Sequence, residues 1–130
     1  MTKPRNNISN ISIETAQKLA IFYIKGHMST ITSDTLINHI KIHADGIDTI
    51  ILDLEMLLSI TLTGVGIICK LSLDMLKTVI LVCSEENREV RGFITDVGLD
   101  DIVVVVPSIS SALAAVAKKL DFDPLNIRLR

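Results

Sequence analysis

The 130-residue chain has no tryptophan, a single tyrosine and three phenylalanines, and it carries no excess of basic residues. Proteins that bind single-stranded nucleic acid stack bases on aromatic side chains, and nucleic-acid binding in general leaves a basic footprint on the sequence. Here the formal net charge is −2. We therefore expect no direct nucleic-acid partner.

Cysteines and long apolar runs are also scarce. Cys69 falls in a predicted helix and Cys83 at the end of a predicted strand, which favours two buried free thiols over a disulfide or a metal clip. The longest uncharged runs, 56–69 and 102–117, are too short for a membrane-spanning helix and are broken by Gly, Pro, Ser or Thr. The first residues lack the apolar core of a signal peptide. We expect a cytoplasmic protein that does not insert into a membrane.

The chain does have enough apolar sequence for one core, because 48% of its residues are hydrophobic. A chain of this length is too short for two ordinary domains. We expect one domain over residues 8–120, between a flexible N-terminus (1–7) and a polar C-terminal tail (121–130).

The segment 48–71 is predicted to organise this domain. Its nearly continuous apolar run at 50–54, interrupted only by Asp53, is typical of a strand that is covered on both faces of a sheet. Thr63 precedes two glycines and an apolar stretch, so its hydroxyl is expected to cap a helix over 63–73. The intervening loop 56–62 then lies at the carboxyl end of a strand, where open α/β sheets place their sites. The helix is apolar around more of its circumference than one sheet face requires, so we expect part of it to meet a partner.

Strands and helices alternate over the rest of the chain. Alternation after an opening hairpin predicts an α/β fold, with a mostly parallel sheet covered by four to five helices. Gly98 is expected to be a left-handed helix cap, and Ser108 or Ser110 to cap the last helix, which should pack through Leu113 and Val116. The predicted elements are strands at 11–13, 18–25, 50–54, 77–83 and 102–106, and helices after Ser33, after Thr63, over 90–97 and after Ser108 or Ser110, the last with Leu113, Val116, Ala117 and Leu120 on one face.

Several short motifs, taken in order, resemble the STAS domains of bacterial anti-sigma factor antagonists and sulfate transporters. That family has a Gly-x-Leu-Asp turn, a strand ending in Asp-Leu, an Asp-Ser-Ser/Thr-Gly-Leu-Gly loop eight residues later, and a Val-Arg-x-x-Leu helix before Gly-Leu. The matching positions are Gly26-His27-Met28-Ser29, Asp53-Leu54, Thr61-Leu62-Thr63-Gly64-Val65-Gly66, Val90-Arg91-Gly92-Phe93-Ile94 and Gly98-Leu99. The resemblance covers roughly residues 8–120 and implies the STAS fold.

The chain departs from the family pattern in the phosphorylation loop. In the antagonists that switch partners, a kinase phosphorylates the serine after the loop aspartate; here the aspartate is replaced by Thr61 and the serine by Leu62, while Ser29 replaces the aspartate of the first turn. A leucine cannot accept a phosphoryl group, so the family switch is not expected at this position. Thr63 is interpreted as a helix cap and Thr61 as a hydroxyl that bonds to local backbone, although either could be a phosphoacceptor.

Other candidate sites are weaker. His39 and His43 are one helical turn apart and His27 precedes them, but a solvated face explains them better than a metal site. The pair Gly64 and Gly66 lacks the remaining residues of a phosphate-binding loop, and no nucleophile and base are spaced for catalysis. Asp53 does not fit the aspartate of a receiver domain, because the paired acids that hold Mg²⁺ are missing. We expect no enzymatic activity, no cofactor and no bound metal.

The resemblance therefore implies a non-enzymatic signalling regulator of the anti-sigma factor antagonist type, which binds an anti-sigma factor or serine-kinase-like protein, or other STAS proteins. Two alternatives stay open: a sensor that holds an anionic ligand, such as a nucleotide or lipid phosphate, at the Thr63 helix start, or a scaffold subunit of a complex of several STAS proteins. The equivalents of the phosphorylation loop are Thr61, Leu62, Thr63 and Gly64, and the predicted partner-binding residues are Ser29, Leu58, Ser59, Thr61, Leu62, Thr63, Val65, Gly66, Ile67 and Leu71.

Overall fold

An antiparallel hairpin opens the fold, in which β1 (Ile11–Ala16) pairs with β2 (Leu19–Met28). β3 (Thr49–Ile60), β4 (Thr78–Val82) and β5 (Val104–Val106) extend the sheet in parallel, so that the strand order in space is the order in the chain. The predicted α/β fold, with a mostly parallel sheet after an N-terminal hairpin, is confirmed.

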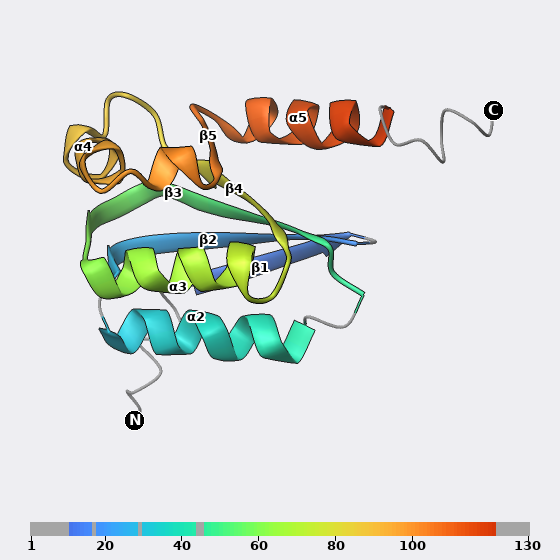
Figure 1. Ribbon diagram of the computed structural model, residues 1–130, viewed down its shortest axis with the longest axis horizontal. Helices are drawn as coiled ribbons and strands as arrows, with labels where there is room; N and C mark the ends of the chain where they lie inside the picture. Colours follow the sequence, from blue (N-terminus) through green and yellow to red (C-terminus); the bar gives the residue numbers. More distant parts are fainter. Residues whose placement is uncertain (1–10, 17, 29, 44–45, 122–130) are drawn as a thin grey trace.

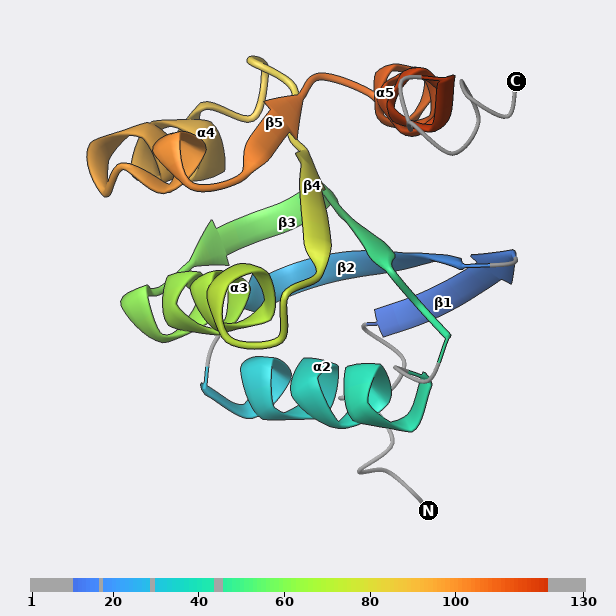
Figure 2. The same cartoon turned by 45° about the vertical axis from the view of Figure 1, so that its right-hand side comes forward.

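Helices cover both faces of this sheet. The computed structural model describes residues 11–16, 18–28, 30–43 and 46–121. In Figures 1 and 2, α2 (Thr30–His43) and α3 (Leu62–Leu73) lie on one side of the strands, and α4 (Arg88–Asp96) and α5 (Ile109–Asp121) lie on the other. A short 3₁₀ helix, η1 (Leu99–Asp101), follows α4. In the part of the chain described, none of these helices is both long enough and apolar enough to cross a membrane.

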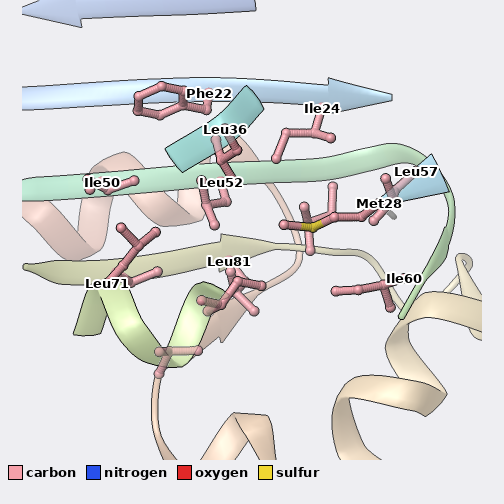
Figure 3. Packing of buried hydrophobic residues seen from close by; sticks show 14 of the residues in the cluster. Phe22, Ile24, Met28, Leu36, Ile50, Leu52, Leu57, Ile60, Leu71 and Leu81 are labelled. Carbon is pink, nitrogen blue, oxygen red and sulfur yellow. The ribbon is translucent and has the colours of Figure 1, made fainter. Parts of the chain in front are cut away.

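Two apolar clusters explain why the strand at 50–54 reads as a continuous apolar run. Side chains of successive strand residues point to opposite faces. Ile50 and Leu52 belong to the larger cluster, which includes Leu36 of α2 and Leu71 of α3 (Figure 3), and all four side chains are fully buried. Ile51 points the other way, into a smaller cluster formed with α5. Both faces of β3 are therefore core.

β3 is longer than predicted. It continues to Ile60, and its register against β2 shifts between Tyr23 and Lys25 and again between Gly26 and His27. At each shift β3 contains one more residue than β2, which is the property of a bulge. The prediction of a loop over 56–62 is therefore wrong, because the bulged strand occupies most of that segment.

Other boundaries also differ from the predicted ones. The first helix begins at Thr30, so Ser33 does not cap it. β5 begins only at Val104, because η1 uses the residues before it. Gly98 has the expected left-handed conformation, with φ of 76°. The elements keep their predicted order despite these shifts.

The cap of α5 is Ser108, one of the two residues predicted for it. The Ser108 Oγ accepts a hydrogen bond from the backbone N–H of Ser111 at 3.1 Å. The predicted packing face of this helix is only partly right, since Val116 packs on the smaller cluster but Leu113 is 41% exposed. Among the α5 residues whose side chains are described, Ala112 is the fully buried one.

Candidate functional site

Thr61 joins the end of β3 to the start of α3. It lies between Ile60 and Leu62 in an extended conformation, with φ of −105° and ψ of 171°. Its Oγ1 accepts a hydrogen bond from the Gly64 backbone N–H at 3.3 Å and donates one to the Met28 carbonyl oxygen at 3.1 Å. Thr61 is thus the helix cap, and the prediction that Thr63 caps the helix is wrong because the helix begins earlier. The interpretation of the Thr61 hydroxyl as bonded to local backbone is confirmed.

Gly64 lets the first turn of α3 approach the ends of two strands. A Cβ atom at this position would lie 3.0 Å from Cγ of Met28 and 3.1 Å from Cγ1 of Ile60, closer than ordinary van der Waals contact. Met28 and Ile60 are both buried, and Figure 3 shows them with Leu57 at the end of the core. The close approach of this helix turn to Met28 and Ile60 therefore requires a glycine here. Gly66, one half-turn later, has no atom within 4 Å of such a Cβ and is exposed.

Asn87 fixes α4 against the bulged part of β3. Its Nδ2 donates hydrogen bonds to the carbonyl oxygens of Leu57 at 2.8 Å and Leu54 at 3.4 Å, and its Oδ1 accepts from the Val90 backbone N–H. The side chain thus caps a helix and binds strand carbonyls at the same time. Sequence reasoning missed Asn87, although asparagine is a preferred capping residue and precedes the predicted helix at 90–97.

A second set of polar contacts holds the loop after β4. The Glu55 carboxylate accepts a hydrogen bond from the Ser84 backbone N–H at 2.5 Å, and Nη1 of Arg91 donates to the Cys83 carbonyl oxygen at 2.9 Å. Burial raises the pKa of the Cys83 thiol, and the Glu55 carboxylate raises it further. This thiol is therefore protonated at neutral pH and is not an activated nucleophile.

Burial also raises the pKa of Asp53 above its ordinary value of 3.8. The hydrogen bond that its Oδ1 accepts from the Glu55 backbone N–H, 2.9 Å long, lowers this pKa, and the Glu55 carboxylate raises it. Burial is the largest of these effects. Asp53 is thus a strand carboxylate held partly out of water, and its hydrogen bond is made to the backbone.

The exposed residues that precede and follow Thr61 in the chain are mainly apolar. Leu62 is 69% exposed, Leu58 63% and Met56 68%, although sequence reasoning did not single out Met56. Met56 and Leu58 are exposed on either side of the buried Leu57, but the bulges in this segment break the alternation that would reveal this in the sequence. We use the name β3–α3 surface for Met56, Leu58, Leu62, Thr63 and Gly66, which are all exposed.

Other predicted site residues lie elsewhere. Val65 and Leu71 are buried in the core, so the prediction that they belong to an exposed helix face is wrong. The reason is that α3 packs on the sheet and also on α2. Ile67 and Ser59 are half-buried, and Ser59 Oγ lies 2.7 Å from Nδ1 of His27.

Two further predicted site residues, Gly64 and Ser29, are not part of this surface. Gly64 is buried beneath the helix start. Ser29 lies outside the described residues, as does the side chain of His43. Within the described part of the chain, no three His, Cys, Asp or Glu side chains are grouped so that they could hold a metal ion.

The profile of the STAS domain family matches residues 10–120. No curated protein sequence gives a significant match.

Several solved structures share the fold. An anti-sigma factor antagonist from Mycobacterium paratuberculosis has a TM-score of 0.69 at 20% identity, covering 82% of this chain and 92% of that one. A putative anti-sigma factor antagonist from Thermotoga maritima has a TM-score of 0.72 at 19% identity, covering 87% and 98%. The phosphorylated form of the Bacillus cell fate determinant SpoIIAA has a TM-score of 0.59 at 17% identity, covering 82% and 98%. At these identities the structures establish a common fold.

Proposed function

Because the chain belongs to the STAS domain family, whose profile covers residues 10–120, we propose that it is a signalling regulator that acts by binding another protein and not by catalysis. The family resemblance seen in its motifs is confirmed by this match. We propose an anti-sigma factor of the serine kinase type as this partner, because several solved structures that share the fold are described as anti-sigma factor antagonists.

The observation that carries this proposal is the apolar character of the β3–α3 surface. Leu58 and Leu62 each expose more than three-fifths of their surface beside the start of α3. Complete burial of a leucine side chain contributes roughly 1.5–3 kcal/mol, so a partner that covers both residues gains a substantial part of the free energy of a micromolar complex. Exposed apolar groups at a helix start suit a protein partner with an apolar contact of its own.

We further propose that binding is not controlled by phosphorylation at the family position. Leu62 has no hydroxyl, and the neighbouring Thr61 hydroxyl is engaged with both Met28 and Gly64. A phosphate on Thr61 would break the helix cap. Without phosphorylation at the family position, the protein behaves as a constitutively unphosphorylated antagonist. Its activity is set by its amount and by its partner.

The proposal is tested by capture of partners from an extract of the source organism, with the purified chain as bait and identification of bound proteins by mass spectrometry. The affinity of the captured protein is then measured by calorimetry for the wild type and for two matched variants, Leu62→Gln and Ile42→Gln. Ile42 is 72% exposed and lies in the last turn of α2. In Figure 1 the end of α2 lies at the opposite end of the helical layer from the start of α3.

We expect Leu62→Gln to weaken binding by about tenfold, which corresponds to about 1.4 kcal/mol. Ile42→Gln should bind like the wild type, since it makes a comparable apolar-to-glutamine change at similar exposure but away from the β3–α3 surface. Equal affinities for all three proteins would show that the partner uses another surface. Capture of other STAS proteins would favour the scaffold role, and a co-purified anionic ligand without protein would favour the sensor role.

A further inference from the structure

The outer edge of β5 presents backbone groups that no described strand pairs with. β5 ends the sheet, with β4 on its inner side. The Val106 carbonyl oxygen accepts a hydrogen bond from the Cys83 N–H at 2.9 Å, so the peptide groups of Val106 face β4. Alternate residues of a strand direct their N–H and C=O groups to opposite edges, so those of Val105 face outward.

Apart from its short length of three residues, this edge lacks the devices by which proteins usually protect a terminal strand. Such edges carry charged side chains, prolines or bulges that discourage pairing with another chain. The segment 102–106 reads Ile-Val-Val-Val-Val and contains no charge and no proline, whereas the opposite edge strand β1 includes Glu14. Val104 is 53% exposed and Ile102 is 42% exposed. The β5 edge is therefore apolar and β-branched, and none of the described strands pairs with it.

We propose that this edge pairs with β5 of a second copy of the chain, antiparallel and about a twofold axis at Val105. In that arrangement the two Val105 residues face each other and exchange two N–H···O=C hydrogen bonds, which is the pattern of a hydrogen-bonded antiparallel pair. Each Val104 then lies opposite Val106 of the other copy, on the sheet face that α5 covers. A twofold interface of this kind is self-complementary, as a homodimer requires.

Charge complementarity favours the antiparallel orientation. Asp100 and Asp101 are exposed just before β5, and α5 begins at Ile109, just after it, with no acidic residue in its first turn. Antiparallel pairing places the start of one β5 beside the end of the other. The two aspartates then lie near the amino end of the second α5, where a helix favours negative charge. Parallel pairing would instead bring the aspartates of the two copies together.

The test is sedimentation equilibrium of the wild type over about 10 μM to about 1 mM, a range suited to a weak interface of few strand residues. The average mass should rise from 14.3 kDa towards twice that value. Val105→Pro removes the outward N–H without removing a hydrogen bond to β4, and proline is tolerated on edge strands. Val104→Lys adds a protecting charge to the same edge, and Thr15→Lys, at an exposed position of β1, is the matched control.

We expect Val105→Pro and Val104→Lys each to raise the dimer dissociation constant at least tenfold, with Thr15→Lys unchanged. Circular dichroism and denaturation midpoints establish that each variant is folded. If Val105→Pro does not fold, the dimer dissociation constant of Val104→Lys tests the proposal instead. A second test is the exchange rate of the Val105 amide hydrogen in the wild type, which should fall as the protein concentration rises. A wild type that stays monomeric, or a dimer that survives Val104→Lys, overturns the proposal. Neither result bears on the β3–α3 surface, since the partner test does not depend on dimer formation.

Discussion

The Thr61 hydroxyl donates a hydrogen bond to the Met28 carbonyl oxygen, 3.1 Å away, and so ties the start of α3 to the end of β2. The Thr61 backbone N–H bonds to the same oxygen at 3.2 Å. One carbonyl oxygen of β2 therefore accepts two hydrogen bonds from the residue that caps α3. The position of the β3–α3 surface depends on this junction more than on any residue exposed in it.

Loss of the Thr61 hydroxyl should destabilise the protein. We expect Thr61→Ala to lower the free energy of unfolding by about 1 kcal/mol, the usual cost of removing a threonine cap. Thr63→Ala should change it by less than about 0.5 kcal/mol, because Thr63 is exposed and caps nothing. Urea denaturation measures both values. Equal losses for the two variants would contradict the assignment of Thr61 as the cap.

Two glycines of α3 should respond in opposite ways to alanine. Gly66→Ala adds a methyl group in open space and should stabilise the helix by up to about 1 kcal/mol. Gly64→Ala places a methyl group against Met28 and Ile60, and overpacking of this kind costs about 1–3 kcal/mol. Thermal unfolding of the two variants, compared side by side, tests the close approach. If Gly64→Ala is as stable as Gly66→Ala, the helix start has room that the structure does not indicate.

The central position of β3 can be tested at Leu52, which is fully buried. Leu52→Ala should cost about 2–5 kcal/mol, because it removes well-packed methyl groups from the core. Leu73→Ala is the control, since Leu73 is 61% exposed at the end of α3 and should lose much less stability. Similar denaturation midpoints for Leu52→Ala and the wild type would place this segment outside the core.

Asp53 should make stability depend on pH in a defined direction. Its pKa in the folded protein is raised, chiefly by burial, so the ionised carboxylate is disfavoured in the folded state. Its contribution to stability is therefore fully present below the unfolded pKa and is lost as the pH rises through the folded pKa. Asp53→Asn should have a higher denaturation midpoint than the wild type at pH 7. This advantage should shrink as the pH falls through the raised pKa of the folded state and should vanish below the unfolded pKa of about 4. A constant difference across this range would mean that ionisation of Asp53 is not the cause.

The leucine at position 62 should keep the protein unphosphorylated at the family position. Incubation with an anti-sigma kinase and ATP should leave the wild type unmodified by intact mass, because leucine offers no acceptor. The double variant Thr61→Asp with Leu62→Ser should gain one phosphate, and Thr61→Asp alone serves as its control. Aspartate is also a good helix cap, so the double variant should remain folded. A phosphate on the wild type at Thr61 or Thr63 would show that a flanking threonine is the acceptor.

The sequence predicts the order of elements well because β3 and β4 contain long runs of buried apolar residues and the helices have apolar stripes. It fails at the end of β3, where the bulges break the alternation of buried and exposed residues. Leu54 and Leu57 are both buried although they are three residues apart. A search for alternation at every second residue cannot reveal a strand with this spacing, so the segment is predicted to be a loop.

The candidate site was predicted in part for a related reason. Thr61 and Thr63 have the same chemical suitability as caps, and only the length of β3 selects Thr61. Burial of Leu71 depends on how α3 packs against the sheet and α2, which is a tertiary property. The exposed character of Leu58 and Leu62 was anticipated, because these residues adjoin the helix start regardless of where the cap falls.

Leu62 contributes little to the fold, since Thr61 provides the cap and Gly64 the close contact, while most of the Leu62 side chain is in solvent. Leucine and serine codons can differ by a single base. A lineage can therefore acquire or discard a phosphorylatable residue here by one nucleotide substitution, without a compensating change elsewhere in the domain. The inherited mode of regulation and the stability of the scaffold are thus free to evolve separately.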